Sequence, residues 1–156
     1  MNVGILFHSC TGNTLSVAQT LAEALRAAGI PAELDRVETD PKEAEAPSFS
    51  IVHAPDPAQY DALVFACPVH GFRISRQMAL YLQDLPDLKG KKTLCFVTHT
   101  FPFGFLGGTG SKKQLEAILR KKGAEVVASA CIDWGSKKRE AQIASLREQT
   151  VPIFHP

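Results

Sequence analysis

The sequence predicts an α/β protein in three layers, with a parallel sheet covered by helices on both faces. Five short apolar runs alternate along the chain with segments of helical periodicity. Continuous apolar runs are typical of strands buried on both faces, and the intervening helices suit the right-handed crossovers between parallel strands. Because 156 residues is the length of one ordinary domain, we expect a doubly wound, five-stranded sheet in a single domain, residues 1–156.

The expected strands are the apolar runs themselves. They lie at residues 3–8, 32–37, 62–67, 93–98 and 126–132. The second run alternates apolar and polar residues, which indicates a less buried strand. Between the second and third strands, residues 40–57 contain four prolines and several acids, so we expect a loop there with at most one short helix.

The expected helices follow from apolar residues spaced three and four positions apart. They cover residues 13–28, 75–85, 111–122 and 137–149. Gly29 and then Pro31 end the first helix, Ser75 can cap the second, and Gly123 ends the third. The last helix has the weakest apolar stripe, so the pattern defines its boundaries least well.

The first strand runs directly into small and hydroxylated residues and then into a helix. This segment consists of Ser9, Cys10, Thr11, Gly12, Asn13 and Thr14. The first turn of a helix leaves backbone N–H groups unpaired, and an anion in front of them satisfies both the donors and the helix dipole. Gly12 allows close approach of the backbone, while the hydroxyls of Ser9, Thr11 and Thr14 offer further donors.

The segment lacks the lysine of a nucleoside triphosphate loop and the glycine spacing of a dinucleotide fingerprint. We therefore predict a site for one phosphate monoester, held by neutral donors. A helix cap with no ligand is the alternative, but one helix needs only one capping residue.

Two further loops should meet this segment, because ligands of open parallel sheets bind beyond the carboxyl ends of the strands, where the strand order reverses. The loop after the third strand contains Pro68, Val69, His70, Gly71 and Phe72, and the fourth strand leads into Thr98, His99, Thr100, Phe101, Phe103 and Gly104. Aromatic faces and close backbone amides can enclose a flat ring. Ordinary core packing is the alternative for the phenylalanines.

The composition argues against several classes of protein. A hydrophobic content of 45% and a formal charge of +1 are typical of a soluble globular protein without the basic excess that nucleic acid or anionic membranes select. We find no apolar run of membrane-spanning length and no leader pattern. Four cysteines without Cys-x-x-Cys spacing suit reduced thiols. We expect a cytoplasmic protein that binds neither nucleic acid nor membrane.

The chain resembles the flavodoxin-like family, in its short-chain type. The resemblance rests on the loop Thr11-Gly-Asn-Thr14, on residues 60–71 around the third strand and on residues 107–123 after the fourth. It implies the strand order 2-1-3-4-5 and non-covalent binding of flavin mononucleotide (FMN). By the same resemblance, Ser9 to Thr14 would hold the phosphate. Residues 68–72 and 98–104 would lie against the two sides of the isoalloxazine ring.

The resemblance implies an FMN-binding electron-transfer protein that serves redox partner proteins. An NAD(P)H-dependent oxidoreductase acting on FMN or a quinone is the alternative; it needs room for a nicotinamide over the ring and often a dimer, so we expect a monomer or a homodimer. A chain at +1 has fewer acids than usual carriers, which predicts a less extreme potential and a different docking surface. A protonated His70 or His99 beside the flavin would make the potential depend on pH.

Three other interpretations use the same residues. Cys10-Thr-Gly-Asn13 resembles the loop of low-molecular-weight tyrosine phosphatases, but Ser16 stands where that chemistry needs an arginine. A metal site would have to combine residues at strand ends that follow no known ligand spacing. Those residues are His8, Cys10, Cys67, His70 and His99. A flavin-free interaction module is the third interpretation, and the intact loop Thr11–Thr14 argues against it.

Overall fold

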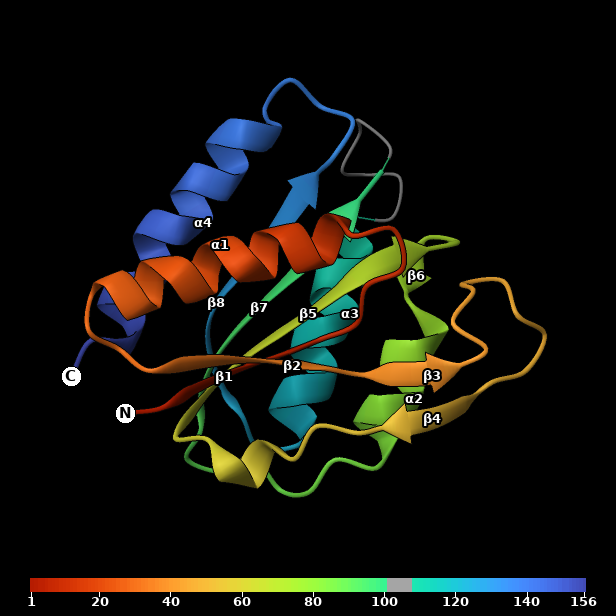
Figure 1. The fold of residues 1–156 in the computed structure, drawn as a ribbon, viewed down its shortest axis with the longest axis horizontal. Helices are drawn as coiled ribbons and strands as arrows, with labels where there is room; N and C mark the ends of the chain where they lie inside the picture. The colour runs from red at the N-terminus through yellow and green to blue at the C-terminus, as the bar shows by residue number, and fades with distance from the viewer. Residues whose placement is uncertain (101–107) are drawn as a thin grey trace.

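A computed structural model describes residues 1–100 and 108–156 of the chain. Its main sheet has five parallel strands in the spatial order β2-β1-β5-β7-β8 (Figure 1). These strands are β1 (Val3–Phe7), β2 (Ala32–Arg36), β5 (Ala62–His70), β7 (Lys92–His99) and β8 (Glu125–Asp133). Counting only the parallel strands, this order is 2-1-3-4-5, so the predicted doubly wound topology is confirmed.

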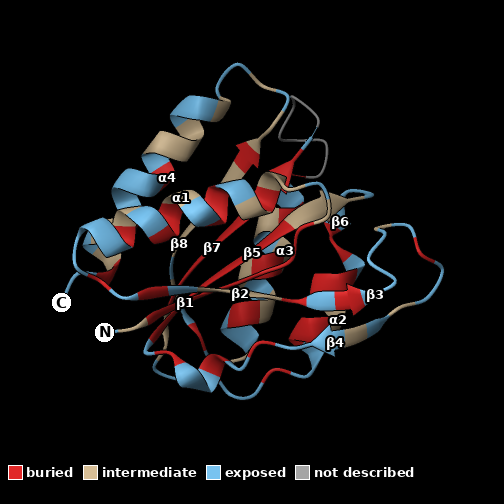
Figure 2. Cartoon of the chain, viewed as in Figure 1, coloured by how far each residue is buried: buried red, intermediate tan, exposed pale blue. Residues whose placement is uncertain are grey.

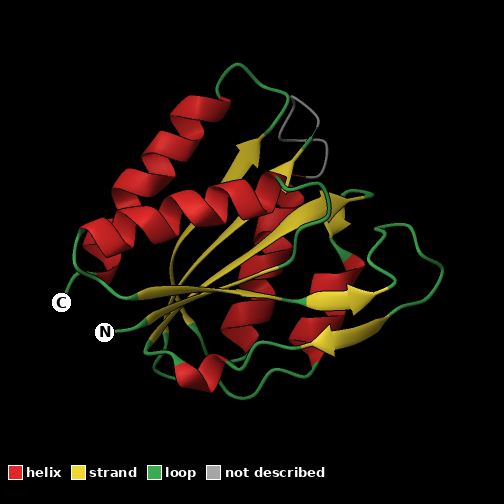
Figure 3. Ribbon diagram, in the orientation of Figure 1, coloured by secondary structure: helices red, strands yellow, loops and turns green. Residues whose placement is uncertain are grey.

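Helices cover both faces of the sheet (Figure 3). One face carries α1 (Asn13–Ala27) and α4 (Arg139–Phe154), and the other carries α2 (Arg76–Gln83) and α3 (Gly108–Lys121). Successive strand residues point to opposite faces, so β1 sends Ile5 into the α1 side and Leu6 into the α2 side. The central strands are buried along most of their length (Figure 2).

The connection from β2 to β5 differs from the prediction. Residues 40–57 were expected to form a loop with at most one short helix. The chain instead makes an antiparallel ribbon of β3 (Glu38–Asp40) and β4 (Ser50–His53). The short 3-10 helix η1 (Pro57–Gln59) follows the ribbon. The pairing joins residues that are separated by a long loop, with Thr39 opposite Ile51. Sequence periodicity does not detect such a pairing, because each strand is only three or four residues long.

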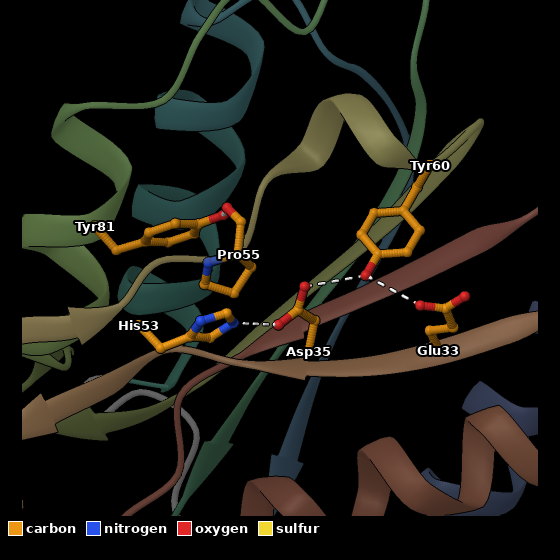
Figure 4. Close-up of polar contacts among 6 residues, drawn as sticks. All are labelled: Glu33, Asp35, His53, Pro55, Tyr60 and Tyr81. Carbon is orange, nitrogen blue, oxygen red and sulfur yellow. Dashed lines mark hydrogen bonds and ion pairs between the residues drawn. The ribbon is translucent and has the colours of Figure 1, made fainter.

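A polar network joins this connection to the edge strand β2 (Figure 4). The Nε2 atom of His53 lies 2.7 Å from Oδ1 of Asp35, and the Tyr60 hydroxyl donates to Oδ2 of Asp35 over 3.0 Å. The ring of Tyr60 covers Gly4 so closely that a Cβ there would lie 2.3 Å from Cδ2 of the ring. On α2, the Tyr81 hydroxyl donates to the carbonyl oxygen of Pro55 over 2.6 Å. The ribbon is therefore fixed to both β2 and α2.

Two other segments extend beyond their predicted limits. The third parallel strand, β5, continues to His70 and turns back into β6 (Arg73–Ile74), so part of the expected loop is a hairpin. The final helix continues to Phe154, whose side chain is fully buried in the core on the α1 side. Within residues 1–100 and 108–156, none of the helices combines the length and apolar character that a membrane span requires.

Candidate functional site

The segment after β1 presents free backbone donors in front of α1. Gly12 precedes the helix with a φ of 93°, a left-handed conformation that glycine adopts without a Cβ penalty. The backbone N–H groups of residues 11–14 have no acceptor within the described part of the chain. A Cβ built on Gly12 would meet no atom within 4 Å, so the space there is open. These donors fit a phosphate dianion, and we call residues 9–14 the phosphate cradle.

The three predicted hydroxyl donors differ in their surroundings. The hydroxyl of Thr14 is buried and lies 2.7 Å from the hydroxyl of Thr98. Ser9 accepts a hydrogen bond from the backbone N–H of Leu15 over 3.3 Å. Thr11 is exposed. The pair Thr14–Thr98 therefore links the start of α1 to the end of β7, and it uses a hydroxyl that the sequence had suggested for the ligand.

A buried hydrogen-bonded chain runs from the cradle towards β6. The Sγ atom of Cys10 lies 3.5 Å from Nε2 of His8, and Nδ1 of His8 lies 2.8 Å from the hydroxyl of Ser75. Burial, then the neighbouring His70 and Arg36, lowers the pKa of His8 to about 4. Burial raises the pKa of the Cys10 thiol, although Arg36 partly opposes this. A neutral imidazole beside a protonated thiol does not form the thiolate that a phosphatase needs.

The turn between β5 and β6 lies next to this chain. Gly71 and Phe72 both adopt positive φ angles, 57° and 66°, and 59% of the Phe72 side chain is exposed. The His70 ring meets the His8 ring edge to face, with 6.4 Å between centroids. Burial, then Arg76, lowers the pKa of His70, so this imidazole is neutral near pH 7. The lowered pKa of His70 disfavours the protonated form that the sequence analysis suggested.

The end of β7 supplies the other side of the site. Thr98 and His99 are buried, and Thr100 is exposed. The Nδ1 atom of His99 lies 3.4 Å from Oδ1 of Asp133, a residue at the end of β8 that the sequence analysis did not single out. Asp133 could have been found from the sequence, because it stands at the end of a strand that is expected to lie beside the strand of His99. The predicted residues Phe101, Phe103 and Gly104 lie outside the described residues.

Two cations beside the cradle were also missed. Arg36, the last residue of β2, donates from Nη2 to the carbonyl oxygen of Ser9 over 2.6 Å, and its guanidinium lies 5.8 Å from the centroid of the Phe7 ring. Lys42 lines the same cavity as Arg36 and Ser9. The expectation of neutral donors alone was therefore incomplete. Arg36 follows a strand that neighbours β1 in the sheet, and that adjacency is the signal that could have identified it.

The residues of the alternative metal-site interpretation do not come together in the described part of the chain. Among the residues that the structure describes, no three His, Cys, Asp or Glu side chains are grouped closely enough to hold a metal ion. His8 and Cys10 contact each other, but His99 pairs with Asp133 across the sheet from them. The geometry thus favours an organic anion in the phosphate cradle over a metal.

The fold and the site define a doubly wound α/β protein with an anion cradle where the strand order reverses. The chain belongs to the flavodoxin family, whose model, described as Flavodoxin, matches residues 5–145. Solved structures have the same fold. A reduced flavodoxin from Megasphaera elsdenii has a TM-score of 0.71 at 24% identity, covering 96% of this chain and 98% of that one. A mutant flavodoxin from Pseudomonas aeruginosa has a TM-score of 0.72 at 15% identity, covering all of both chains.

Proteins related to this chain in sequence are named as dehydrogenases rather than as flavodoxins. A protein of Archaeoglobus fulgidus named NAD(P)H dehydrogenase (quinone) is 29% identical over 120 residues, which are 64% of this chain and 62% of that protein. A Cupriavidus metallidurans protein of the same name is 40% identical over 92 residues, 54% of this chain and 46% of that protein. The chain therefore spans less than two thirds of the length of these relatives.

Proposed function

We propose that this protein binds FMN in the phosphate cradle and transfers electrons. The observation that carries the proposal is the row of four backbone N–H groups at residues 11–14, for which residues 1–100 and 108–156 supply no acceptor. They lie in front of the open space at Gly12. Neutral backbone donors at a helix start suit a phosphate dianion. Membership of the flavodoxin family supports the choice of FMN. Bound FMN would supply one-electron and two-electron transfer, while the protein sets its access and potential.

The other residues of the proposed site have distinct roles. The hairpin residues Pro68–Phe72 would contact one side of the isoalloxazine ring, and Thr98–Thr100 would lie on the other side. Phe72 is the exposed aromatic side chain that can stack on the ring. Because His70 is neutral, it adds no positive charge on this side of the ring. We therefore expect His70 to make no contribution to a pH dependence of the flavin potential.

A titration tests this function directly. FMN is added to the apoprotein while flavin fluorescence is measured, and riboflavin, which lacks the phosphate, is titrated in parallel. We expect saturation at one equivalent of FMN and much weaker binding of riboflavin. Equal affinities for the two flavins would contradict the role of the cradle, and no binding of either would contradict the proposed function.

The second candidate is an NAD(P)H-dependent reductase that passes electrons to a quinone. The relatives named NAD(P)H dehydrogenase (quinone) favour it, although they match only part of their own length. Oxidation of NADPH or NADH by the FMN-loaded protein, followed at 340 nm in the presence of a soluble quinone, separates the two candidates. Catalytic turnover supports the reductase, and electron exchange only with a partner protein supports the carrier.

Four free cysteines support the proposal of a cytoplasmic location, because reducing compartments keep thiols unpaired. Redox partner proteins are the proposed partners of a carrier, and NAD(P)H is the proposed partner of a reductase. The proposed oligomeric state is a monomer or a homodimer. A homodimer would favour the reductase, because a second subunit often completes the nicotinamide site of such an enzyme. Sedimentation of the FMN-loaded protein measures this state.

A further inference from the structure

A small cavity lies beside the phosphate cradle and contains two cations. Arg36 and Lys42 line it, together with the buried Ser9 and the exposed Glu38. The remaining lining residues are His8, Val37 and Thr39. Its volume is about 110 Å³. This volume is enough for one phosphate group beside the two cations.

The two cations of this cavity outnumber its one carboxylate, Glu38. Neither Arg36 nor Lys42 takes part in any of the ion pairs of the described residues. With Glu38 counted, the cavity has a formal excess of one positive charge, since its His8 is neutral. Arg36 uses one N–H for the carbonyl oxygen of Ser9, which holds the guanidinium in place and leaves other donors available. A fixed guanidinium is well suited to a phosphate.

The neighbouring cavity has the opposite character. It is lined by Cys10, Thr11, Lys42, Ala44 and two carboxylates, Glu43 and Glu45, and has a volume of about 390 Å³. Its two carboxylates outnumber its one cation, Lys42, which it shares with the smaller cavity. Arg36 lines only the smaller of these two cavities, which therefore has the more positive formal charge.

We propose that Arg36 and Lys42 form a second phosphate-binding site, which shares only Ser9 with the cradle and uses none of the free backbone N–H groups of residues 11–14. Its ligand is a phosphate monoester dianion or free orthophosphate, which present the same tetrahedral oxygens. The monoester would be the 2′-phosphate of NADP(H), with the rest of the dinucleotide outside the cavity. The site does not depend on flavin, because all of its groups belong to the chain.

Calorimetric titration of the FMN-saturated protein tests the proposal, because FMN fills the cradle and leaves only the second site. The probes are NADP⁺, NAD⁺ and orthophosphate at constant ionic strength. We expect NADP⁺ or orthophosphate to bind. Arg36→Gln and Lys42→Gln should each lower the affinity of that probe about tenfold, as expected for the loss of one charged hydrogen bond. Matched controls are Arg147→Gln and Lys121→Gln, which remove exposed cations from α4 and α3.

The outcomes distinguish the sources of phosphate. Tighter binding of NADP⁺ than of both NAD⁺ and orthophosphate identifies the dinucleotide, whereas equal binding of orthophosphate identifies the free ion. If no phosphate probe binds, or if both variants bind like the wild type, the proposal is wrong. A loss of FMN affinity in Lys42→Gln with unchanged riboflavin affinity would assign the cavity to the flavin phosphate instead. Lys42 is exposed and makes no hydrogen bond within the described residues, so this variant preserves the fold.

If the protein fails to bind FMN, the same titrations are run on the protein without flavin. The proposed function then fails, while the dependence of phosphate binding on Arg36 and Lys42 still decides the second site. The variant Gly12→Asp separates the two sites in that case, since it blocks the cradle and leaves the cavity intact.

Discussion

The cradle and the β5–β6 turn face the same proposed ligand but are built in opposite ways. The cradle offers backbone N–H groups between two buried elements, and its left-handed residue is a glycine, Gly12. The turn offers an exposed side chain, and one of its two residues with positive φ, Phe72, is not a glycine. A left-handed phenylalanine costs about 1 to 2 kcal/mol. In the proposed complex, affinity for the phosphate would come from preformed structure, whereas contact with the ring would use a strained and exposed residue.

The two regions are connected through His8. This residue directly precedes the cradle, and its Nδ1 atom lies 2.8 Å from the hydroxyl of Ser75, which follows β6. The backbone N–H of Ser75 in turn donates to the carbonyl oxygen of Pro68 over 3.0 Å. A change at one end of the proposed site can therefore reach the other end through hydrogen bonds. The following predictions test each region and its connection.

The largest expected effect is at Gly12. In Gly12→Asp a carboxylate occupies the open space before α1, and its charge repels the phosphate. We expect FMN affinity to fall at least a hundredfold, equivalent to about 2.7 kcal/mol, because several charge-assisted hydrogen bonds are lost. Quenching of flavin fluorescence measures this loss.

Gly29→Asp is the matched control for that variant. Gly29 also has a positive φ, 79°, and open space around its Cβ position, but it lies at the far end of α1. Both variants should lower the melting temperature by a few degrees, as expected for about 1 kcal/mol of backbone strain. Only Gly12→Asp should lose FMN, and normal FMN affinity in that variant would contradict the cradle.

The next effect is a pH dependence of stability caused by His8, which connects the two regions. The pKa of His8 is about 4 in the folded protein, below the value of 6.5 that a free histidine has. Between these pH values the unfolded state binds more protons, so stability falls as the pH is lowered through this range. The expected loss from this group is about 3 kcal/mol between pH 7 and pH 4. Urea unfolding at both pH values measures it.

His8→Asn removes the titrating group and keeps a hydrogen-bonding side chain near Ser75. The loss of stability between pH 7 and pH 4 should therefore be smaller in this variant than in the wild type. An unchanged loss would show that His8 is not buried in its neutral form.

A smaller effect is expected at the link between α1 and β7. Thr98→Val keeps the shape of the side chain but leaves the buried hydroxyl of Thr14 without its partner. We expect a decrease of about 1 to 2 kcal/mol in the free energy of unfolding. The double variant Thr14→Val with Thr98→Val should recover part of this loss, because no buried hydroxyl then remains. A double variant that is less stable than both single variants would contradict the pairing.

The smallest effect is expected at the turn. Phe72→Gly removes the stacking side chain, so FMN and riboflavin should both bind about three- to tenfold more weakly, as for the loss of one aromatic contact. The ratio of the two affinities should not change, in contrast to Gly12→Asp. A change in that ratio would show that the turn and the cradle do not act separately.

The sheet and the predicted cradle both depend on local pattern, and the structure confirms the sheet. Residues 9–14 are contiguous, and a helix start has the same free donors in any protein. The parallel strands were recognisable as continuous apolar runs. The strand order came from the resemblance, and the structure confirms it.

The remaining features depend on contacts between distant residues. Arg36 reaches Ser9 only because β2 lies beside β1, and Asp133 meets His99 only because β8 lies beside β7. The β3–β4 ribbon was missed because its short strands are separated by prolines and acids that are typical of a loop. The single signal for it was the run Ser50-Ile-Val-His53, with two β-branched residues.

The β3–β4 ribbon, which connects β2 to β5, should open locally more often than the central strands. The ribbon is antiparallel, short and largely exposed, with 62% of the Val52 side chain accessible, whereas β5 and β7 are mostly buried. Its amide protons should exchange with solvent much faster than those of the central strands. Lys42 lies in the loop of this ribbon, while residues 9–14 are anchored on β1 and α1. Opening of the ribbon would therefore remove one cation of the small cavity and leave the cradle assembled.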